Sequence, residues 1–242
     1  MKRFLSTCFG LTVMAAAASY SSAALIDVDF GIGGSSPSPV ESGFTSVAPV
    51  YHATATSTYA ANTATFTIGT YHVTFADFLS APGFRDRGTT TGSMPDLYRD
   101  FYYENDNDAS TVDAFSIQVA DLTPSTAYDV TFYAYDGNPG GNTRTQTYSV
   151  LTGTGSSGTS SYVLGSPPAT PLQDAVILRV TTDSSGAFKY KIQGDTTASK
   201  SAFVLLNGFS VAAVPEPGSV AAFLGLAGIM LRRAGRRRSS AC

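Results

Sequence analysis

The sequence predicts an all-β protein: an antiparallel β-sandwich of the jelly-roll type, with a signal helix at the N-terminus and a short hydrophobic helix near the C-terminus. Short runs of alternating apolar and polar residues are separated by clusters of Gly, Ser, Thr and Pro. The composition, with 23 glycines, 12 % aromatic and 14 % charged residues, is typical of exported β-rich proteins. Outside the two apolar ends, no stretch of ten residues has a helical period.

Nine strands are expected between residues 25 and 213. In the expected strand Ala127–Asp136, the side chains of Tyr128, Val130 and Phe132 share one face. Apolar and polar side chains alternate in the same way in the expected strand Ala187–Gln193. About nine strands at this spacing favour one antiparallel sandwich. The expected strands are Leu25–Phe30, Thr65–Phe75, Asp113–Asp121, Ala127–Asp136, Thr145–Thr152, Ser160–Leu164, Ala175–Thr182, Ala187–Gln193 and Phe203–Val211.

The charges divide the chain into three parts. The formal net charge is −3, but residues 25–213 hold eight basic and seventeen acidic residues, which gives this stretch a net charge of −9. The basic residues outside it lie at the two ends. An acidic middle argues against nucleic acid as a partner, because phosphate binding needs a basic face. The two basic, apolar ends must therefore serve another purpose.

Residues 1–24 are predicted to be a secretory signal peptide. Lys2 and Arg3 precede an apolar stretch, and Ser22-Ala23-Ala24 supplies small residues for cleavage before Leu25. The cysteines lie at positions 8 and 242, so residues 25–213 must be held by packing rather than by disulfides.

Residues 214–242 form a three-part tail. The motif Pro215, Glu216 and Pro217 is followed by the apolar run 220–231 and by the basic cluster 232–238. The prolines fix an extended backbone. Twelve helical residues span about 18 Å, less than the ~30 Å of a bilayer core, so insertion would need flanking arginines that reach the interface. Those expected flanking residues are Arg232, Arg233, Arg236, Arg237 and Arg238.

This tail resembles the PEP-CTERM sorting signal of bacteria that make extracellular polysaccharide. The resemblance implies recognition by an exosortase, which is a membrane cysteine transpeptidase, after passage through the secretion machinery. It further implies transient anchoring in the inner membrane, followed by delivery to the cell envelope or the extracellular space. The basic cluster would stay on the cytoplasmic side.

The middle of the chain carries a second resemblance. Its short motifs are similar, in the same order, to the galactose-binding-like jelly-roll module of rhamnogalacturonan acetylesterase-like proteins. The resemblance implies a sandwich of carbohydrate-associated ancestry, and it does not bring an activity with it because the Gly-Asp-Ser catalytic half of those enzymes is absent. The motifs are Asp27–Gly31, Ser42–Thr45, Arg85–Gly88, Leu97–Phe101 and Phe203–Val211.

Residues 122–128 resemble the turn and tyrosine corner of fibronectin type III domains. In that motif the Tyr128 hydroxyl binds nearby backbone where the chain enters a strand. A type III domain is about half the length available here, so the motif is interpreted as a local feature.

No complete catalytic constellation is present in the sequence. The histidines are His52 and His72, and no Gly-x-Ser-x-Gly nucleophile elbow occurs. His72 alternates out of phase with the large apolar residues, which predicts an exposed strand histidine. We therefore expect no enzyme activity. The remaining catalytic alternative is glycoside hydrolysis by two carboxylates from the region Asp96–Asp113.

Glu104, Asp106 and Asp108 supply alternate acidic side chains in one segment. Carboxylate oxygens suit Ca²⁺, but the segment lacks the Gly and the final bidentate Glu of an EF-hand loop. It is a candidate cation site or a solvated acidic loop, and no other cofactor is expected.

Arg85, Arg87 and Arg99 are candidate glycan contacts, since guanidinium groups bind carboxylates and hydroxyls through paired hydrogen bonds. Tyr98 and Tyr102 could supply faces on which sugars stack. Alternatively, the arginines form ion pairs with Asp86, Asp96 or Asp100 and hold a long loop against the sandwich.

These observations predict an exported protein of the envelope or extracellular matrix with a structural or adhesive role in exopolysaccharide. A carbohydrate-binding module is the first alternative, and a glycan-active hydrolase is the second. The charge of −9 would repel an anionic polysaccharide unless cations bridge the two.

Overall fold

The structure is a computed structural model, and it describes residues 23–30, 39–47, 64–76, 83–88, 91–104, 114–138, 141–194 and 204–215. The described residues form strands β1 to β15 and no helix. The helices expected at the two ends lie outside the described residues. Within the described part, no helix has the length and hydrophobicity needed to cross a membrane.

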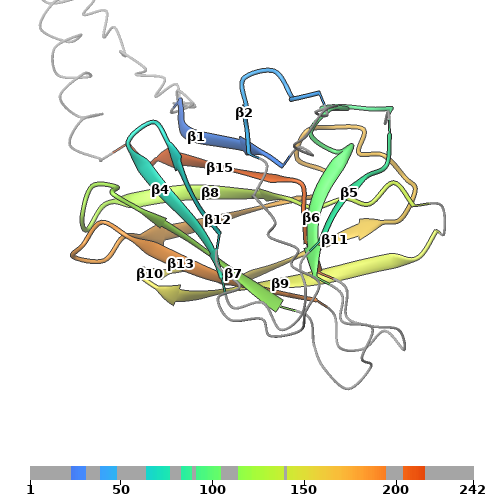
Figure 1. The fold of residues 1–242 in the computed structure, drawn as a ribbon. Helices are drawn as coiled ribbons and strands as arrows, with labels where there is room; N and C mark the ends of the chain where they lie inside the picture. Colours follow the sequence, from blue (N-terminus) through green and yellow to red (C-terminus); the bar gives the residue numbers. More distant parts are fainter. Residues whose placement is uncertain are drawn as a thin grey trace, which may run out of the picture.

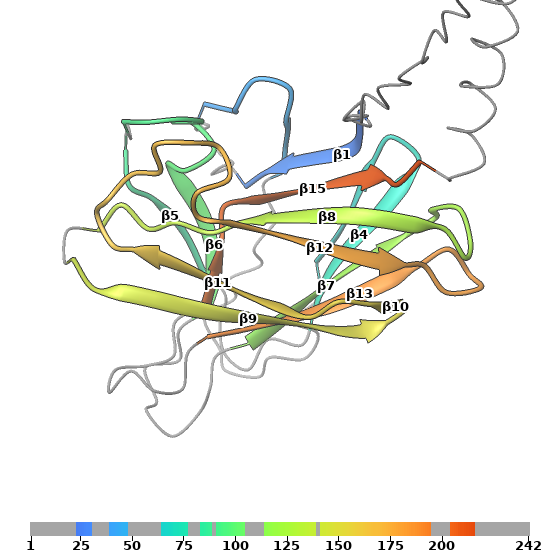
Figure 2. The same ribbon diagram turned by 180° about the vertical axis from the view of Figure 1, so that it is seen from behind.

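Two six-stranded sheets form the sandwich (Figures 1 and 2). In spatial order, sheet A contains β10 (Thr154–Gly155), β12 (Ala175–Thr181), β8 (Ala127–Tyr133), β15 (Gly208–Ala213), β1 (Ala24–Asp29) and β2 (Thr45–Ser46). Sheet B contains β11 (Gly158–Val163), β9 (Thr143–Thr152), β13 (Phe188–Gly194), β7 (Ala114–Ala120), β4 (Tyr71–Ala76) and β3 (Ala64–Ile68).

The connections confirm the predicted antiparallel jelly-roll sandwich. From β7 to β13, each successive strand lies in the other sheet. All the long strand pairs are antiparallel, and the two-residue contact between β1 and β2 is parallel. β1 pairs with β15, so the first and last described strands lie side by side and the two chain ends leave the sandwich at the same place (Figure 1).

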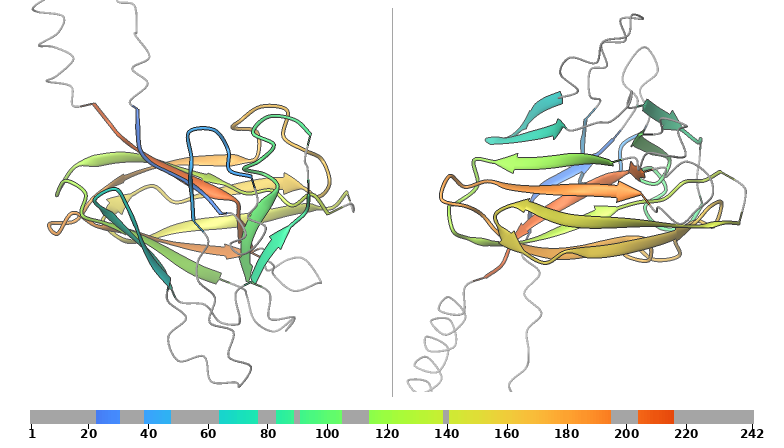
Figure 3. Two further views of the ribbon diagram at one scale, coloured as in Figure 1. Left: turned by 45° about the horizontal axis from the view of Figure 1, so that its top comes forward. Right: turned by 90° about the horizontal axis from the view of Figure 1, so that it is seen from below.

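A third sheet lies across the opposite end of the sandwich. Sheet C contains β14 (Val204–Leu206), β6 (Asp100–Glu104) and β5 (Gly83–Asp86), and Figure 3 shows it beside the two main layers. Its inner side chains join the main core: Tyr102 packs against Phe75, with ring centroids 5.4 Å apart. Sheet C therefore closes one end of the hydrophobic core.

Alternating side chains of sheets A and B fill the space between them. Phe132 of β8 stacks on Tyr148 of β9 at 4.9 Å, and Tyr190 of β13 meets Phe132 edge to face at 5.3 Å. Each of these rings is fully buried. Burial of one such side chain contributes about 2–3 kcal/mol, so this aromatic layer is a principal source of stability in a sandwich without disulfides.

Two of the expected strands are each divided in the structure. Thr65–Phe75 is a hairpin of β3 and β4 that turns at Gly69, whose φ is 61°. Phe203–Val211 is divided at Asn207 into β14 and β15, which belong to different sheets. The core side chains change phase at both breaks, from Ile68 to Val73 and Phe75 and from Val204 and Leu206 to Phe209 and Val211, so strict alternation would have separated the strands. Strands β2, β5, β6 and β10 were not expected.

The tyrosine corner is present as predicted. The backbone N–H of Thr123 donates to the Tyr128 hydroxyl at 3.1 Å. At the other end of β8, the segment 91–99 covers Tyr133 and Tyr135, and Tyr98 packs edge to face on both rings.

One carboxylate is buried where β1 approaches sheet C. Asp29 is 0 % exposed; its Oδ2 accepts a hydrogen bond from the Glu41 backbone N–H at 2.7 Å, and its Oδ1 has no partner among the described residues. Burial raises the pKa of Asp29 to about 7, and the nearby carboxylates of Asp100, Glu41 and Asp96 act in the same direction.

The Asp29→Asn variant should be more stable than the wild type at pH 8 by about 4 kcal/mol, and equally stable near pH 4. Because the folded protein holds the Asp29 proton more tightly than the unfolded chain, this stabilising contribution is complete below pH 3.8 and is lost as the pH rises to about 7. Urea unfolding between pH 4 and 8, in EDTA, measures the difference. An equal loss of stability in both proteins over this range would contradict the prediction.

Candidate binding surface

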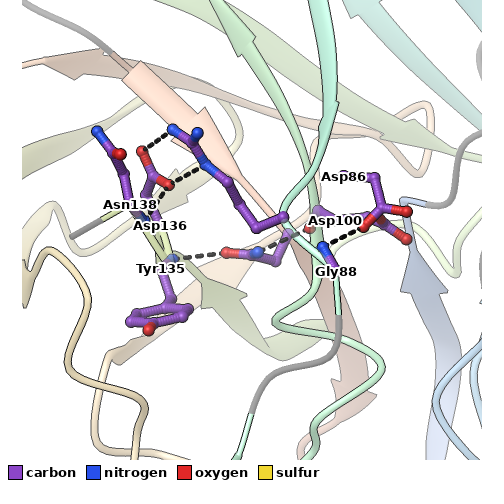
Figure 4. Close-up of polar contacts among 8 residues, drawn as sticks. Asp86, Gly88, Asp100, Tyr135, Asp136 and Asn138 are labelled. Carbon is purple, nitrogen blue, oxygen red and sulfur yellow. Dashed lines mark hydrogen bonds and ion pairs between the residues drawn. The ribbon is translucent and has the colours of Figure 1, made fainter.

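Arg87, a candidate glycan contact, forms a bidentate ion pair with Asp136. Its Nε donates to Oδ1 at 2.7 Å and its Nη2 to Oδ2 at 3.0 Å (Figure 4). The Asp136 side chain is 6 % exposed and also accepts a hydrogen bond from the Asn138 backbone N–H at 2.9 Å. The Arg87 guanidinium lies 5.7 Å from the Phe101 ring centroid. Arg87 thus joins the end of β5 to the end of β8.

Arg99 and Arg85 have partners within sheet C and its loop. Arg99 donates to both carboxylate oxygens of Asp86, with 2.8 Å between Nε and Oδ1, and this contact lowers the pKa of Asp86. Arg85 lies over the ring of Tyr103, 5.0 Å from its centroid. The structure thus contains the ion pair between Arg99 and Asp86 that the second interpretation of the sequence anticipated.

The two candidate tyrosines do not present ring faces to solvent. Tyr98 is 1 % exposed and donates its hydroxyl proton to the Pro171 carbonyl at 3.1 Å. Tyr102 is 2 % exposed and packs between Phe30 and Phe115. The expected sugar-stacking platform is therefore corrected: β6 directs Tyr102 into the core, and the turn before β6 folds Tyr98 over sheet A.

Asn207 and Gly208 connect sheet C to sheet A. The Asn207 side chain accepts from the Tyr135 backbone N–H at 2.6 Å and donates from Nδ2 to the Asp100 carbonyl at 2.7 Å (Figure 4). Its own backbone N–H donates to the Tyr133 carbonyl at 2.9 Å. The side chain and the backbone N–H of Asn207 are therefore occupied by hydrogen bonds within the protein, and they hold this end of the sandwich together.

Several expected sites lie wholly or partly outside the described residues. In the acidic segment, the Glu104 side chain and all of Asp106 and Asp108 lie outside. The other sites that lie outside are His52, Glu216, Pro217 and the arginine cluster 232–238. Pro215 is described and exposed. His72 is exposed, as predicted, and pairs with Asp121. In the described ranges, no three His, Cys, Asp or Glu residues are grouped so that they could hold a metal ion.

The outer face of sheet B is a broad polar surface that was not proposed from the sequence. The side chains that point away from the core are mainly hydroxyls, amides and two lysines, and most are exposed or half-buried. Thr65 and Thr74 hydrogen-bond to one another across β3 and β4 at 2.9 Å, and Thr145 and Ser161 do so across β9 and β11 at 3.0 Å. His72, Leu151 and Val163 are also exposed on this face, whereas Ser116 is buried. The other polar side chains of the face are Thr65, Thr67, Thr74, Gln118, Lys189, Lys191, Gln193, Thr145, Thr147, Ser149, Thr159 and Ser161.

The chain matches no protein-family model and no curated protein. Among solved structures, it is similar to the ANX2 ectodomain from Arabidopsis thaliana, with 10 % identity, a TM-score of 0.42 and coverage of 79 % of this chain and 49 % of that chain. It is similar to Xyl-CBM35 in complex with a glucuronic acid-containing disaccharide, with 16 % identity, a TM-score of 0.34 and coverage of 57 % and 86 %.

A third similar structure is TmCBM61 in complex with β-1,4-galactotriose, with 10 % identity, a TM-score of 0.31 and coverage of 60 % of this chain and 90 % of that chain. The chain spans less than half the length of the ANX2 structures that it matches. At TM-scores below 0.5, these similarities carry no argument about the ligand or activity of this chain.

Replacing Arg87 by Ala should lower the free energy of unfolding by about 2–3 kcal/mol, because the Asp136 carboxylate would remain buried without its cation. Arg179→Ala is the matched control. Arg179 also binds an aspartate, Asp129, through two hydrogen bonds of 2.8 and 3.0 Å, but these side chains are 61 % and 37 % exposed. Its loss should cost less than about 1 kcal/mol. Urea denaturation compares the two, and equal losses would refute a specific structural role for Arg87.

Proposed function

We propose that this chain is a non-catalytic, polysaccharide-binding protein of the bacterial envelope or extracellular matrix, and that the outer face of sheet B is its contact surface. This function combines the expected exopolysaccharide association with the carbohydrate-binding alternative. It is chosen over a purely structural role because the sandwich presents a wide polar face that its own core does not use.

The observation that carries the proposal is the regular array of hydrogen-bonding side chains on sheet B. Neighbouring strands lie about 4.8 Å apart, and side chains on one face of a strand repeat about every 6.8 Å. Thr147 of β9 and Thr159 of β11 face one another across the ladder, and both are exposed. Such an array offers donors and acceptors to several sugar hydroxyls at once.

The described ion pairs outside the candidate catalytic region Asp96–Asp113 also favour binding over hydrolysis. Asp86 and Asp136 are each held by an arginine, and His72 is paired with Asp121 on the exposed strand β4. A carboxylate fixed to a guanidinium is a poor general acid, since its proton affinity is lowered. We therefore retain the expectation that the chain is not an enzyme.

Export and sorting rest on the sequence of the two ends. The signal peptide and the PEP-CTERM-like tail support passage through the secretion machinery, transient inner-membrane anchoring and recognition by an exosortase. In the structure β15 ends at Ala213, the Val214 backbone N–H donates to the Ala127 carbonyl at 2.9 Å, and Pro215 is exposed. The exposure of Pro215 supports the proposal that a membrane enzyme acts at the motif that begins there.

The purified chain should bind at least one bacterial or plant polysaccharide with a micromolar dissociation constant. Affinity electrophoresis against a panel of neutral and acidic polysaccharides, followed by calorimetry, measures it. A variant with Thr147→Ala, Thr159→Ala and Ser161→Ala should bind about tenfold more weakly, since it loses three hydrogen-bonding groups. Thr131→Ala on the outer face of sheet A is the control. Absence of binding throughout the panel would refute the function.

Deletion of Pro215–Cys242 should release the folded protein into the periplasm or medium. The physical reason is the loss of the apolar run and of the arginines that flank it. Cell fractionation with immunodetection measures its distribution. A chain lacking only Ser239–Cys242 keeps the motif, the apolar run and the arginines, and serves as the control. Normal envelope association of the longer deletion would refute the sorting proposal.

A further inference from the structure

The buried carboxylate of Asp29 lies against a short surface loop, residues 39–46. Alternation along β1 directs Ile26 and Val28 into the main core and Asp29 to the opposite side of the strand. There the Glu41 backbone N–H of the loop donates to Asp29 Oδ2, while Oδ1 has no hydrogen-bond partner among the described residues. Ionised Asp29 would thus hold one charged oxygen away from water without a hydrogen bond.

The charged groups that act on Asp29 are carboxylates from each element packed against it. They are Glu41 of the loop, Asp96 of the turn before β6, and Asp100 at the start of β6. The cation of the same turn, Arg99, donates to both carboxylate oxygens of Asp86. On the neighbouring strands, Asp29 lies opposite Gly208 and Ser46, which are uncharged. Burial first, and then these carboxylates, favour the protonated form of Asp29 in the folded protein.

The loop 39–46 is held weakly in comparison with the other elements around Asp29. Its strand, β2, pairs with β1 at two positions, whereas β15 pairs with β1 at five, and β6 lies between β5 and β14 (Figure 1). Most of its residues are exposed, and the half-buried Phe44 packs edge to face on Tyr133 at 5.9 Å. Water therefore reaches Asp29 at the lowest free energy when this loop is displaced and the main core stays intact.

From this arrangement we propose that the loop 39–46 is a pH-dependent lid, which is closed while Asp29 is protonated and is opened by its ionisation, releasing Phe44 from Tyr133. In the open state water supplies hydrogen bonds to both carboxylate oxygens, and the separation from the Glu41 carboxylate increases. This device goes beyond the proposed polysaccharide binding and does not depend on it.

The direction of the pH dependence follows from the pKa of Asp29 in the two states. With the loop closed, burial raises this pKa to about 7, and with the loop open we expect the ordinary value of 3.8. The ratio of open to closed molecules should therefore rise from about pH 4 to pH 7 and level off above pH 7. Between pH 5 and pH 8 the expected increase is roughly hundredfold.

Amide hydrogen exchange of the full chain between pH 5 and pH 8, in EDTA, measures this opening. The reporters are the N–H groups of Glu41 and Val47, which donate to Asp29 Oδ2 at 2.7 Å and to the Asp29 carbonyl at 2.9 Å. After correction for the intrinsic exchange rate, their protection should fall about hundredfold. At every pH they should exchange faster than the amides of β15, which open only with the sandwich.

Two substitutions on β1 separate Asp29 from its surroundings. Asp29→Asn keeps an acceptor for the Glu41 N–H but does not ionise, so protection at Glu41 and Val47 should change less than twofold between pH 5 and pH 8. Asp27→Asn is the matched control, because Asp27 is half-buried on the same side of β1 and its replacement also removes one carboxylate. It should show the wild-type fall in protection.

Phe44→Trp gives a second measurement, since the chain contains no other tryptophan. Quenching of its fluorescence by acrylamide should increase from pH 5 to pH 8, and it should stay constant when Asp29→Asn is added. Thermal melting at each pH verifies that the variants are folded.

Three results would overturn the inference: constant protection at Glu41 and Val47 in the wild type, an equal fall in the Asp29→Asn variant, or exchange at the same rate as the β15 amides. The last result would show that the whole sandwich opens instead of the loop. The wild-type measurement decides the question even where a variant fails to fold. The polysaccharide-binding function would stand in each case, because its test uses a different face of the molecule.

Discussion

Asn207 lies where sheet C meets sheet A, and the arrangement of the whole closed end depends on its hydrogen bonds. Its side chain joins the backbone of β6 to the segment after β8, while its carbonyl accepts the Phe30 N–H at 2.9 Å. Asn207 is 0 % exposed, so each of these backbone groups would otherwise be buried unpaired, at about 1–3 kcal/mol apiece. The next residue must be glycine, because a Cβ at Gly208 would lie 2.2 Å from the Val28 carbonyl oxygen.

The ion pairs of Arg87 and Arg99 lie around this junction, whereas the described ion pair on sheet B joins His72 to Asp121. The Arg87–Asp136 pair, the Arg99–Asp86 pair and the buried Asp29 all lie near sheet C or the loops that cover sheet A. Sheet B has a different character, since its outer face contains hydroxyls, amides and lysines supported by an aromatic layer beneath. The ion pairs at the closed end and the proposed binding surface therefore lie in different parts of the sandwich. Substitutions on the outer face of sheet B need not disturb the core.

The two ends of the described chain meet on the edge of sheet A, at the end remote from sheet C (Figure 1). A tail attached there leaves both the junction at Asn207 and the lysine-bearing face of sheet B unobstructed by the last described residues. This separation supports the proposal that a membrane enzyme processes the tail and that the sandwich binds a polysaccharide.

The sequence by itself determined the fold class, the corner at Tyr128 and the buried faces of the long strands, because alternation reports directly which side chains avoid water. It also revealed the partly ionic character of the Arg85–Arg99 region. Tertiary structure decided which interpretation of that region holds: Tyr98 and Tyr102 are in the core, and Arg87 binds Asp136, 49 residues away. Such pairings arise from strand order, which local patterns do not specify. The same reason applies to the outer face of sheet B, whose side chains are brought together by the order of its strands.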